Sequence, residues 1–337
     1  MNTKKFAPIG YGLLLLGLIA APFVGAYPVF VMKLLCFALF ASAFNLLLGY
    51  TGLLSFGHAA FLGGAAYITG QSIKAWGVTP EIGLLLGVLT GALLGLVMGF
   101  FAIRRQGIYA TMITLALAQM IYFACLQLPF TGGEDGLQGV PRGKLFGLLD
   151  LQSDLTMYYV CLVVVVLAFL VIVRTIHSPF GQVLKGIKEN EPRAISLGYD
   201  TNRFKLLAFV ISAALAGVAG SLKTLVLGFA TLSDVHWSAS GHVVLMTLVG
   251  GLGTLSGPIV GSAVVVLLEN KIGDLGNFLA HATGIEWFNT LGESVTIVTG
   301  LIFVVCVLAF RRGIMGELIA WLERMRTGKS SKDSASH

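Results

Sequence analysis

Residues 178–205, SPFGQVLKGIKENEPRAISLGYDTNRFK, form the longest polar passage between two strongly apolar segments of the chain. Ser178 can cap a helix whose first position is Pro179, because proline lacks the N–H that would stay unbonded there. Apolar residues then recur at helical spacing, which predicts one apolar stripe made of Phe180, Val183, Leu184 and Ile187. The pattern predicts a surface helix that contacts another protein, or alternatively an amphipathic helix that lies on lipid.

A second short helix is expected just after the first. Pro192 should end the first helix near Asn190, since the residue before a proline avoids helical geometry. Residues 193–197 can form one more turn, and Gly198 suits a left-handed cap at its end.

The composition is that of an integral membrane protein. Of the 337 residues, 56% are hydrophobic and 11% are charged, whereas soluble domains carry roughly 25% charged residues. Apolar runs of about 20 residues fit a bilayer core of roughly 30 Å as helices, and the ten-residue alternation of β-barrel strands is not seen. We expect an all-α, polytopic helical bundle. The net charge of +6 fits membrane orientation better than nucleic-acid binding, since no basic stripe with aromatic residues is present.

Nine apolar segments are predicted. They are 9–26, 29–48, 53–73, 82–103, 107–128, 157–173, 205–227, an interrupted region at 241–268, and 292–310. With Lys4 and Lys5 in the cytoplasm, alternation of sides places Arg104, Arg105 and the 178–205 stretch inside. Of the 22 lysines and arginines, 16 fall inside, 4 outside and 2 near span ends, where Lys33 and Lys223 should extend toward the outer interface. A cleaved signal peptide is the alternative for the first segment.

The region at 241–268 is interrupted by glycines, namely Gly250, Gly251, Gly253 and Gly257. Two short helices that meet there, as a re-entrant hairpin or as two crossings, would return the C-terminus to the cytoplasm and give eight or ten spans. Irregular backbone at membrane depth needs protein or a water-filled cavity around it, so we expect this segment at a translocation path. A glycine-rich loop near the interface is the alternative.

Small residues line two other predicted spans. Glycines recur at every fourth position at 83, 87, 91, 95 and 99, which predicts a close-packing seam, and Ala213, Ala216, Gly217 and Gly220 form a similar one. Glu134 and Asp135 lie in the longest outside loop and are candidates either for contact with a soluble partner or for a solvated turn.

Enzyme chemistry finds little support. No G-x-x-x-x-G-K-[ST] motif is present, His58 and His242 are isolated in the sequence, and the four cysteines (36, 125, 161 and 306) lack C-x-x-C spacing and are expected to be inert core residues. An ion-coupled carrier is a stronger competitor, but the acids Glu81, Glu269 and Glu293 sit at predicted span ends rather than in mid-span.

Four blocks of sequence resemble the branched-chain amino acid permeases of ABC importers, in the LivM-like branch. They are NLLLGYTGLLSFGHAAFLGGAAY at 45–67, TGGEDGLQGVP at 131–141, the 178–205 stretch, and GGLGTLSGPIVG at 250–261. In the third block Pro192 and Arg193 precede Ala194, which departs from the E-A-A-x-x-x-G loop of other importers.

The resemblance implies a transmembrane permease domain at 1–313 and a cytoplasmic coupling helix region at 178–200. The tail at 314–337 has no counterpart in the family, and its polar composition predicts disorder at its end. The coupling residues would be Phe180, Val183, Leu184, Ile187, Glu189, Glu191, Ala194 and Gly198. Candidates for the pore are Asn45, Gly49, Gly52, Ser55 and His58, together with the four glycines of the break; tight packing and backbone hydrogen bonding are the alternative role for the first set.

The implied partners are a second, LivH-like permease, two LivG/LivF-like ATPases that bind ATP-Mg, and a periplasmic binding protein. This chain itself would hold no cofactor. It would lie in the bacterial inner membrane with both termini cytoplasmic and carry leucine, isoleucine and valine, with urea or short amides as the alternative cargo.

Overall fold

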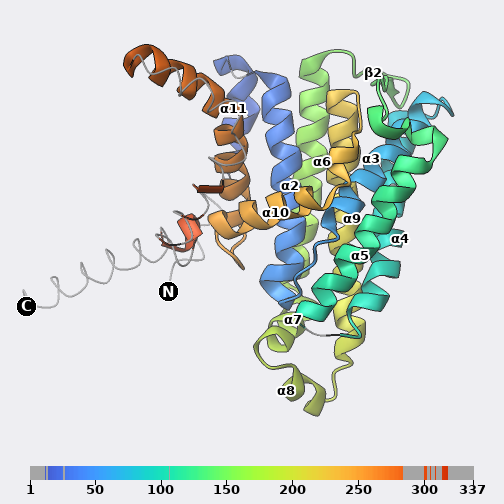
Figure 1. Cartoon of the computed structure of the whole chain (residues 1–337), viewed down its shortest axis with the longest axis vertical. Coiled ribbons are helices and arrows are strands. Elements are labelled where there is room, and N and C mark those ends of the chain that lie inside the picture. The colour runs from blue at the N-terminus through green and yellow to red at the C-terminus, as the bar shows by residue number, and fades with distance from the viewer. Residues whose placement is uncertain are drawn as a thin grey trace, which may run out of the picture.

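The computed structural model of the chain describes residues 12, 14–25, 27–105, 107–283, 300, 301, 304, 308 and 313–317, with side chains at 272–283 left out. Most of the described chain is a bundle of long helices that run side by side (Figure 1). They are α2 (Pro28–Thr51), α3 (His58–Lys74), α4 (Pro80–Ala102), α5 (Ile108–Gln127), α6 (Asp154–His177) and α9 (Thr201–Leu227). The predicted all-α, polytopic class is confirmed.

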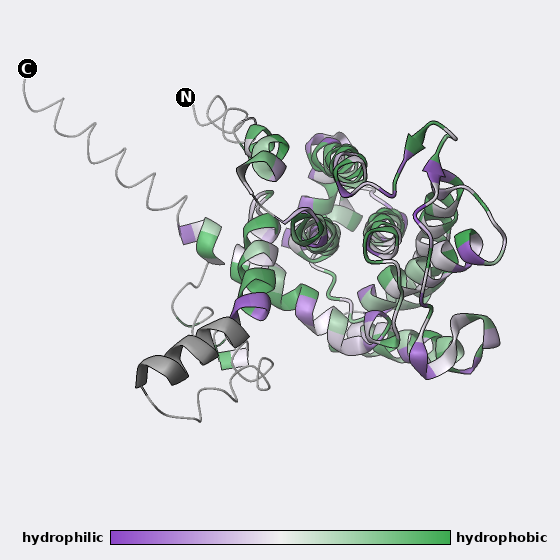
Figure 2. Ribbon diagram, turned by 90° about the horizontal axis from the view of Figure 1, so that it is seen from above, coloured by the Kyte–Doolittle hydropathy of each residue, from purple (hydrophilic) through white to green (hydrophobic). Residues whose placement is uncertain are grey.

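Five of these helices, α2, α4, α5, α6 and α9, are long and apolar enough to cross a membrane. A shorter apolar helix, Leu14–Phe23, lies within the first predicted span and ends in the 3-10 turn η1 (Ala21–Val24). Figure 2 shows hydrophobic residues over most of the ribbon, with hydrophilic ones concentrated in the connections. The predicted span at 292–310 lies outside the described residues except for 300, 301, 304 and 308.

Short elements mark the two ends of the bundle. One end carries α7 (Pro179–Glu189) and α8 (Glu191–Ser196), and we call it the α7–α8 end. The opposite end, which we call the loop end, carries the 128–153 connection with η2 (Pro129–Thr131), η3 (Gly133–Asp135) and the antiparallel pair β1 (Lys144–Leu145) and β2 (Leu149–Asp150). There Lys74 donates to the carbonyl oxygen of Gln138 at 2.6 Å. Residues 74 and 138 thus share an end, as the predicted alternation requires.

The packing seam predicted for α4 joins this helix to α9. Gly91 and Gly95 are buried, and a Cβ added to either would lie within 2.6 Å of Ala213 on α9. On another side of α9, Gly220 meets the backbone of Leu62 on α3 just as closely. Because glycine leaves room for a neighbouring backbone, α9 packs tightly between α3 and α4. Both predicted seams are confirmed.

The third span is shorter than predicted. Residues 53–57 are not helical, and α3 begins only at His58. Side chains satisfy the irregular backbone: Thr114 accepts from the N–H of Phe56, and Ser55 accepts from the N–H of Gly57. Buried backbone groups need such partners when no helix supplies them. The apolar pattern did not distinguish this non-helical segment from a helix.

The interrupted region consists of α10 (Trp237–Gly250), a break at 251–256, and α11 (Gly257–Thr283). The chain leaves the loop end, where Ala230 pairs with Leu137 beside η4 (Leu232–Asp234), and α10 then runs across the bundle (Figure 1). The predicted meeting of two helices at the glycines is confirmed. The predicted end at residue 268 is wrong, because α11 continues to Thr283 and thus places Glu269 inside the helix.

Candidate functional site

The α7–α8 segment folds locally as its sequence predicts. Ser178 caps α7 by accepting from the N–H of Gly181 at 3.3 Å, and Asn190 caps α8 by accepting from the N–H of Arg193 at 3.0 Å. Gly198 follows α8 with φ at +87°, a left-handed conformation that side chains with a Cβ disfavour. The two helices therefore have fixed ends and a fixed turn between them.

The apolar stripe of α7 faces the bundle. Leu184 and Ile187 are buried, and Phe180 stacks on Phe204 of α9 with ring centroids 5.6 Å apart. α7 packs against α2, α6 and α9. Three of the four stripe residues proposed to contact a partner thus anchor α7 to its own chain, because burying apolar surface is favourable wherever it is available.

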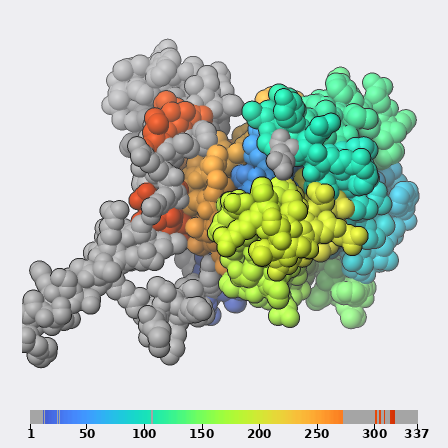
Figure 3. Space-filling view, turned by 90° about the horizontal axis from the view of Figure 1, so that it is seen from below, coloured from blue at the N-terminus to red at the C-terminus, as the bar shows by residue number. Residues whose placement is uncertain are grey.

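An open groove lies on the other side of α7 and α8, with a volume of about 440 Å³. Three residues from the predicted coupling set line it, Val183, Glu189 and Ala194. Arg193, Leu197 and Tyr199 complete the charged and apolar lining, and the exposed fraction of Leu197 reaches 70%. Figure 3 shows this part of the chain, in yellow-green, covering a large area of the end seen from below.

Three exposed apolar residues of this surface, Ile195, Leu197 and Tyr199, were not predicted from the sequence. Their signal was present in the sequence as large apolar side chains on both sides of Gly198, in an otherwise polar stretch. Exposed apolar groups ringed by charges are typical of protein contact sites.

Glu191, also in the predicted set, faces inward. Its carboxylate forms a salt bridge with Lys205 and accepts a hydrogen bond from the hydroxyl of Thr201 at 3.2 Å. Both partners lie at the start of α9. Glu191 therefore holds α8 on α9.

Lys188 connects α7 to the C-terminal end of α2. Its ammonium donates to the carbonyl oxygen of Gly49 at 2.7 Å, and its Cγ would lie 3.2 Å from a Cβ built on Gly52. Gly52 has φ at +74° and caps α2. Gly49 and Gly52, both proposed for the pore, therefore contact Lys188 of α7.

Asn45 connects the same end of α2 to the break between α10 and α11. Its Nδ2 donates to the carbonyl oxygen of Thr254 at 2.9 Å, and its Oδ1 accepts from the N–H of Gly253, also at 2.9 Å. Gly250 and Gly257 pack backbone to backbone, since a Cβ on Gly250 would meet the carbonyl of Gly257. The break is thus held on α2, and α7 reaches it through Gly49.

Ser55 and His58 are fully buried. The His58 Nε2 lies 2.9 Å from the Ser212 hydroxyl of α9, and its ring is packed among Phe44, Phe61 and Phe209. His58 thus joins α3 to α9, whereas Ser55 accepts from the N–H of Gly57 beside it. A pore role for them stays a prediction.

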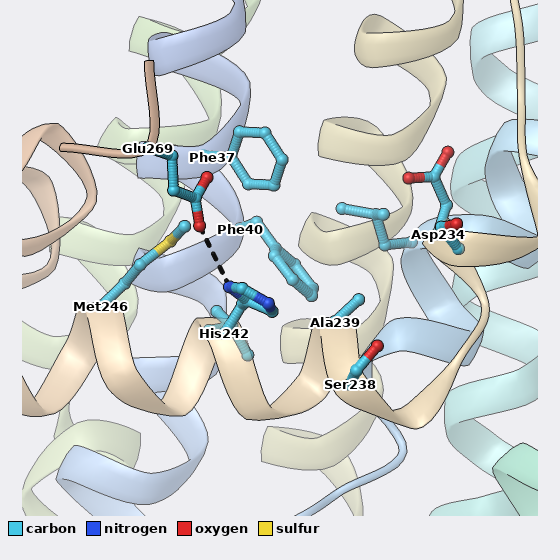
Figure 4. Close-up of a pocket in the computed structure, with 11 residues that line it drawn as sticks. Phe37, Phe40, Asp234, Ser238, Ala239, His242, Met246 and Glu269 are labelled. Atoms are coloured by element: carbon cyan, nitrogen blue, oxygen red, sulfur yellow. Dashed lines mark ion pairs between the residues drawn. The ribbon is translucent and has the colours of Figure 1, made fainter. Parts of the chain in front are cut away.

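Two pairs of ionisable side chains lie near α10, contrary to two sequence expectations, and Figure 4 shows one of them, His242–Glu269. His242, which is isolated in sequence, lies with its Nδ1 3.2 Å from a carboxylate oxygen of Glu269 on α11. Lys223 is buried and paired with Asp234, so it does not extend to the outer interface. The sequence could not reveal either pair, because their partners come from different elements.

At the loop end, Glu134 and Asp135 of η3 are exposed to solvent. A hydrogen bond from the side chain of Gln138 to the carbonyl oxygen of Asp135, at 3.1 Å, steadies their turn. This end therefore presents two acidic side chains to solvent, and their contact with a soluble partner stays a prediction.

Long apolar helices, glycine seams and a helix break hydrogen-bonded to α2 define the class of the chain: a multi-pass helical membrane protein. Residues 29–309 match the family model described as "Branched-chain amino acid transport system / permease component", and the chain belongs to this family. The recognition made from its four sequence blocks is confirmed.

Several relatives carry transport names. The chain is similar to the high-affinity branched-chain amino acid transport system permease protein LivM of Salmonella typhimurium, at 28% identity over 69% of this chain and 60% of that protein. It is also similar to the probable LivH permease of Methanocaldococcus jannaschii (24%, covering 69% and 74%) and to the tyrosine transport system permease of Clostridioides difficile (29%, covering 51% and 55%). The match thus spans three fifths of the length of the Salmonella relative. No solved structure matches the chain.

Proposed function

We propose that this chain is one of two permease subunits in an ATP-driven importer that carries leucine, isoleucine and valine across a bacterial inner membrane. The observation that supports this most directly is the α7–α8 groove, exposed on one end of the bundle and linked through Lys188 and Gly49 to the helix break. The family assignment and the printed names of the relatives point to the same role.

In this proposal a cytoplasmic ATPase subunit docks on the groove. The chain has one such segment among its described residues, so two ATPases would require a second, LivH-like permease. ATP-Mg would be bound by the ATPases. Their closure would displace α7 and α8, and the contacts of Lys188 and Glu191 would pass the displacement to α2 and α9. The bundle would then shift between two packings with different contacts.

The α7–α8 end is accordingly cytoplasmic, and so are both termini. The loop end faces the periplasm, where the exposed Glu134 and Asp135 of η3 would contact a substrate-binding protein. This orientation agrees with the excess of lysine and arginine assigned to the α7–α8 side.

The role of the groove in ATPase docking can be tested by replacing an exposed leucine with aspartate at each end of the molecule. Leu197→Asp places a charge in the groove, whereas Leu148→Asp makes the same change at the loop end, where Leu148 is 88% exposed. With all importer subunits co-expressed, we expect Leu197→Asp to lose the co-purifying ATPases and Leu148→Asp to retain them. Equal retention of the ATPases by both variants would contradict the docking site.

One observation favours a second function, that of an ion-coupled carrier. The pairs His242–Glu269 and Lys223–Asp234 lie within the bundle, and ionisable groups at membrane depth are common in proton and ion pathways. Leucine uptake into proteoliposomes separates the two functions. Uptake by the importer requires ATP on the side of the membrane that carries the ATPases, and it continues in the presence of a proton ionophore. Uptake by a carrier would continue without ATP and stop when the ionophore is added.

A further inference from the structure

A pocket of about 210 Å³ lies between α2, α3, η4, α10 and α11 (Figure 4). Phe37 and Phe40 line it from α2, the helix that runs from residue 28 to residue 51. Both phenylalanines therefore lie near the midpoint of a helix long enough to span the membrane. The pocket is thus at about the middle depth of the bilayer, a depth at which substrate sites are found in transporters.

The pocket carries charge at this depth. His242 of α10 and Glu269 of α11 form an ion pair on one side, with 42% and 25% of their side chains exposed, respectively. Ionisable side chains at the bilayer centre cost roughly 2.5 to 3.5 kcal/mol on insertion scales and face a bundle interior or a water-filled cavity rather than lipid. The exposed side of this pair therefore faces an aqueous path or another part of an assembled transporter.

The two acids of the pocket differ in their partners. Asp234 is buried and bonded to Lys223, a permanent cation, and its other carboxylate oxygen accepts from the N–H of Thr231. Among the residues that the structure describes, Glu269 pairs with His242, whose imidazole is a cation only when protonated. Glu269 is thus the acid of this pocket that is better placed to accept a hydrogen bond from an incoming cation.

The remaining lining is largely apolar. It includes Phe40 from α2 and Val243 and Met246 from α10, and Figure 4 shows Ala239 and Ser238 farther along α10 from Glu269. Apolar walls with a few convergent polar groups are the usual composition of small-molecule sites. A ligand that suits this pocket therefore combines one cationic group with a compact apolar side chain.

We propose that this pocket binds an aliphatic amino acid in transit, with its ammonium group at Glu269 and its side chain against Phe40, Val243 and Met246. The inference rests on the proposed importer function for the delivery of the substrate. The family assignment gives neither this binding site nor the orientation of the amino acid within it.

The test uses the assembled importer with Ala239→Cys, which places a thiol in the pocket. A maleimide labels this thiol, and protection from labelling reports occupancy. The probes are L-leucine, 3-methylbutylamine, which keeps the ammonium and lacks the carboxylate, and 4-methylpentanoate, which keeps the carboxylate and lacks the ammonium. Gln138→Cys at the loop end is the control for general changes in reactivity, and the parent chain gives the background of the native cysteines.

We expect leucine and the amine to protect Ala239→Cys, and the acid to leave it unprotected. In the same background, Glu269→Gln should weaken protection about tenfold, as the loss of a charge-assisted hydrogen bond predicts, and Glu269→Asp should restore part of it. Protection by the acid but not by the amine, no protection by any probe, or no labelling at all would overturn the site. If the wild-type complex shows no ATP-dependent leucine uptake, the proposed importer function is wrong. The labelling pattern still shows whether leucine binds in this pocket.

Discussion

The ammonium group of Lys188 on α7 lies 2.7 Å from the carbonyl oxygen of Gly49 on α2, although the two residues are 139 positions apart in the chain. The last four carbonyls of a helix have no partner within the helix, and a cation near them is favoured by the helix dipole. Gly49 is in this last turn of α2, which ends at Thr51. The contact therefore satisfies a free carbonyl and at the same time links the α7–α8 segment to the membrane bundle.

Lys188→Met should uncouple ATP hydrolysis from uptake. The substitution keeps most of the chain length but removes the hydrogen bond to Gly49, with a cost of roughly 1 to 3 kcal/mol for the carbonyl left unpaired. We expect the assembled importer to keep hydrolysing ATP while leucine uptake per ATP falls several-fold. The ratio of uptake to phosphate release in proteoliposomes is the measurement. Lys185→Met on the same helix is the control, because the ammonium of Lys185 lies 5.6 Å from the ring of Tyr50 and makes a weaker contact. Equal ratios for the two variants would argue against a link through Lys188.

The two ends of the bundle should be accessible from opposite sides of the membrane. Lys188→Cys marks the α7–α8 end and Gln138→Cys marks the loop end, and both positions are exposed. In intact cells an impermeant maleimide is expected to label only Gln138→Cys, and inverted vesicles are expected to show the reverse. Labelling of both positions from one side would refute the proposed topology.

Gly91→Ala should destabilise the bundle. A Cβ at Gly91 would lie 2.6 Å from the carbonyl oxygen of Ala213 and 3.1 Å from the Cα of Gly217, and backbone atoms cannot move away as a flexible side chain can. Overpacking of this kind costs roughly 1 to 3 kcal/mol. We expect a lower midpoint of thermal unfolding and lower accumulation in the membrane.

Gly186→Ala is the matched control for this prediction. Gly186 is also helical, but a Cβ there meets nothing within 4 Å. Alanine is favoured over glycine in a helix by about 1 kcal/mol, so this variant should unfold at the same temperature as the wild type or above it. A similar loss of stability in both variants would mean that the α4–α9 seam is not the cause.

The buried pair Lys223–Asp234 should show strong coupling in a double-mutant cycle. Removing one partner leaves an uncompensated buried charge, which typically costs 3 to 5 kcal/mol, whereas replacing both partners can be nearly neutral. Asp234→Asn alone should therefore lower the unfolding midpoint more than Lys223→Met combined with Asp234→Asn. Additive effects of the two substitutions would show that the pair does not interact energetically.

The class of the fold followed from the sequence because it depends on local, repetitive features. Apolar runs of bilayer length predicted helices close to α2, α4, α5, α6 and α9, and the four-residue glycine spacing predicted the α4–α9 seam. The caps at Ser178 and Gly198 were also visible, since capping depends on residues close together in the chain.

Two boundaries were wrong for the same kind of reason. Residues 53–57 continue the apolar pattern but are not helical, and Thr114 and Ser55 accept from their backbone N–H groups in place of helix carbonyls. The second segment was expected to end at residue 268 with Glu269 at its end, but α11 continues to Thr283, and Glu269 within it lies beside His242 of α10. Apolar content alone cannot report a partner from another helix.

What the sequence by itself determined is therefore a multi-pass helical bundle of the branched-chain amino acid permease family with one amphipathic α7–α8 segment. Only the tertiary structure decided which face of α7 is turned inward, that Lys188 and Asn45 join α7, α2 and the helix break, and that Glu269 meets His242. The physical reason is that periodicity and capping act over a few residues, whereas a buried charge or carbonyl is stabilised by whichever distant group the packing brings within hydrogen-bond distance.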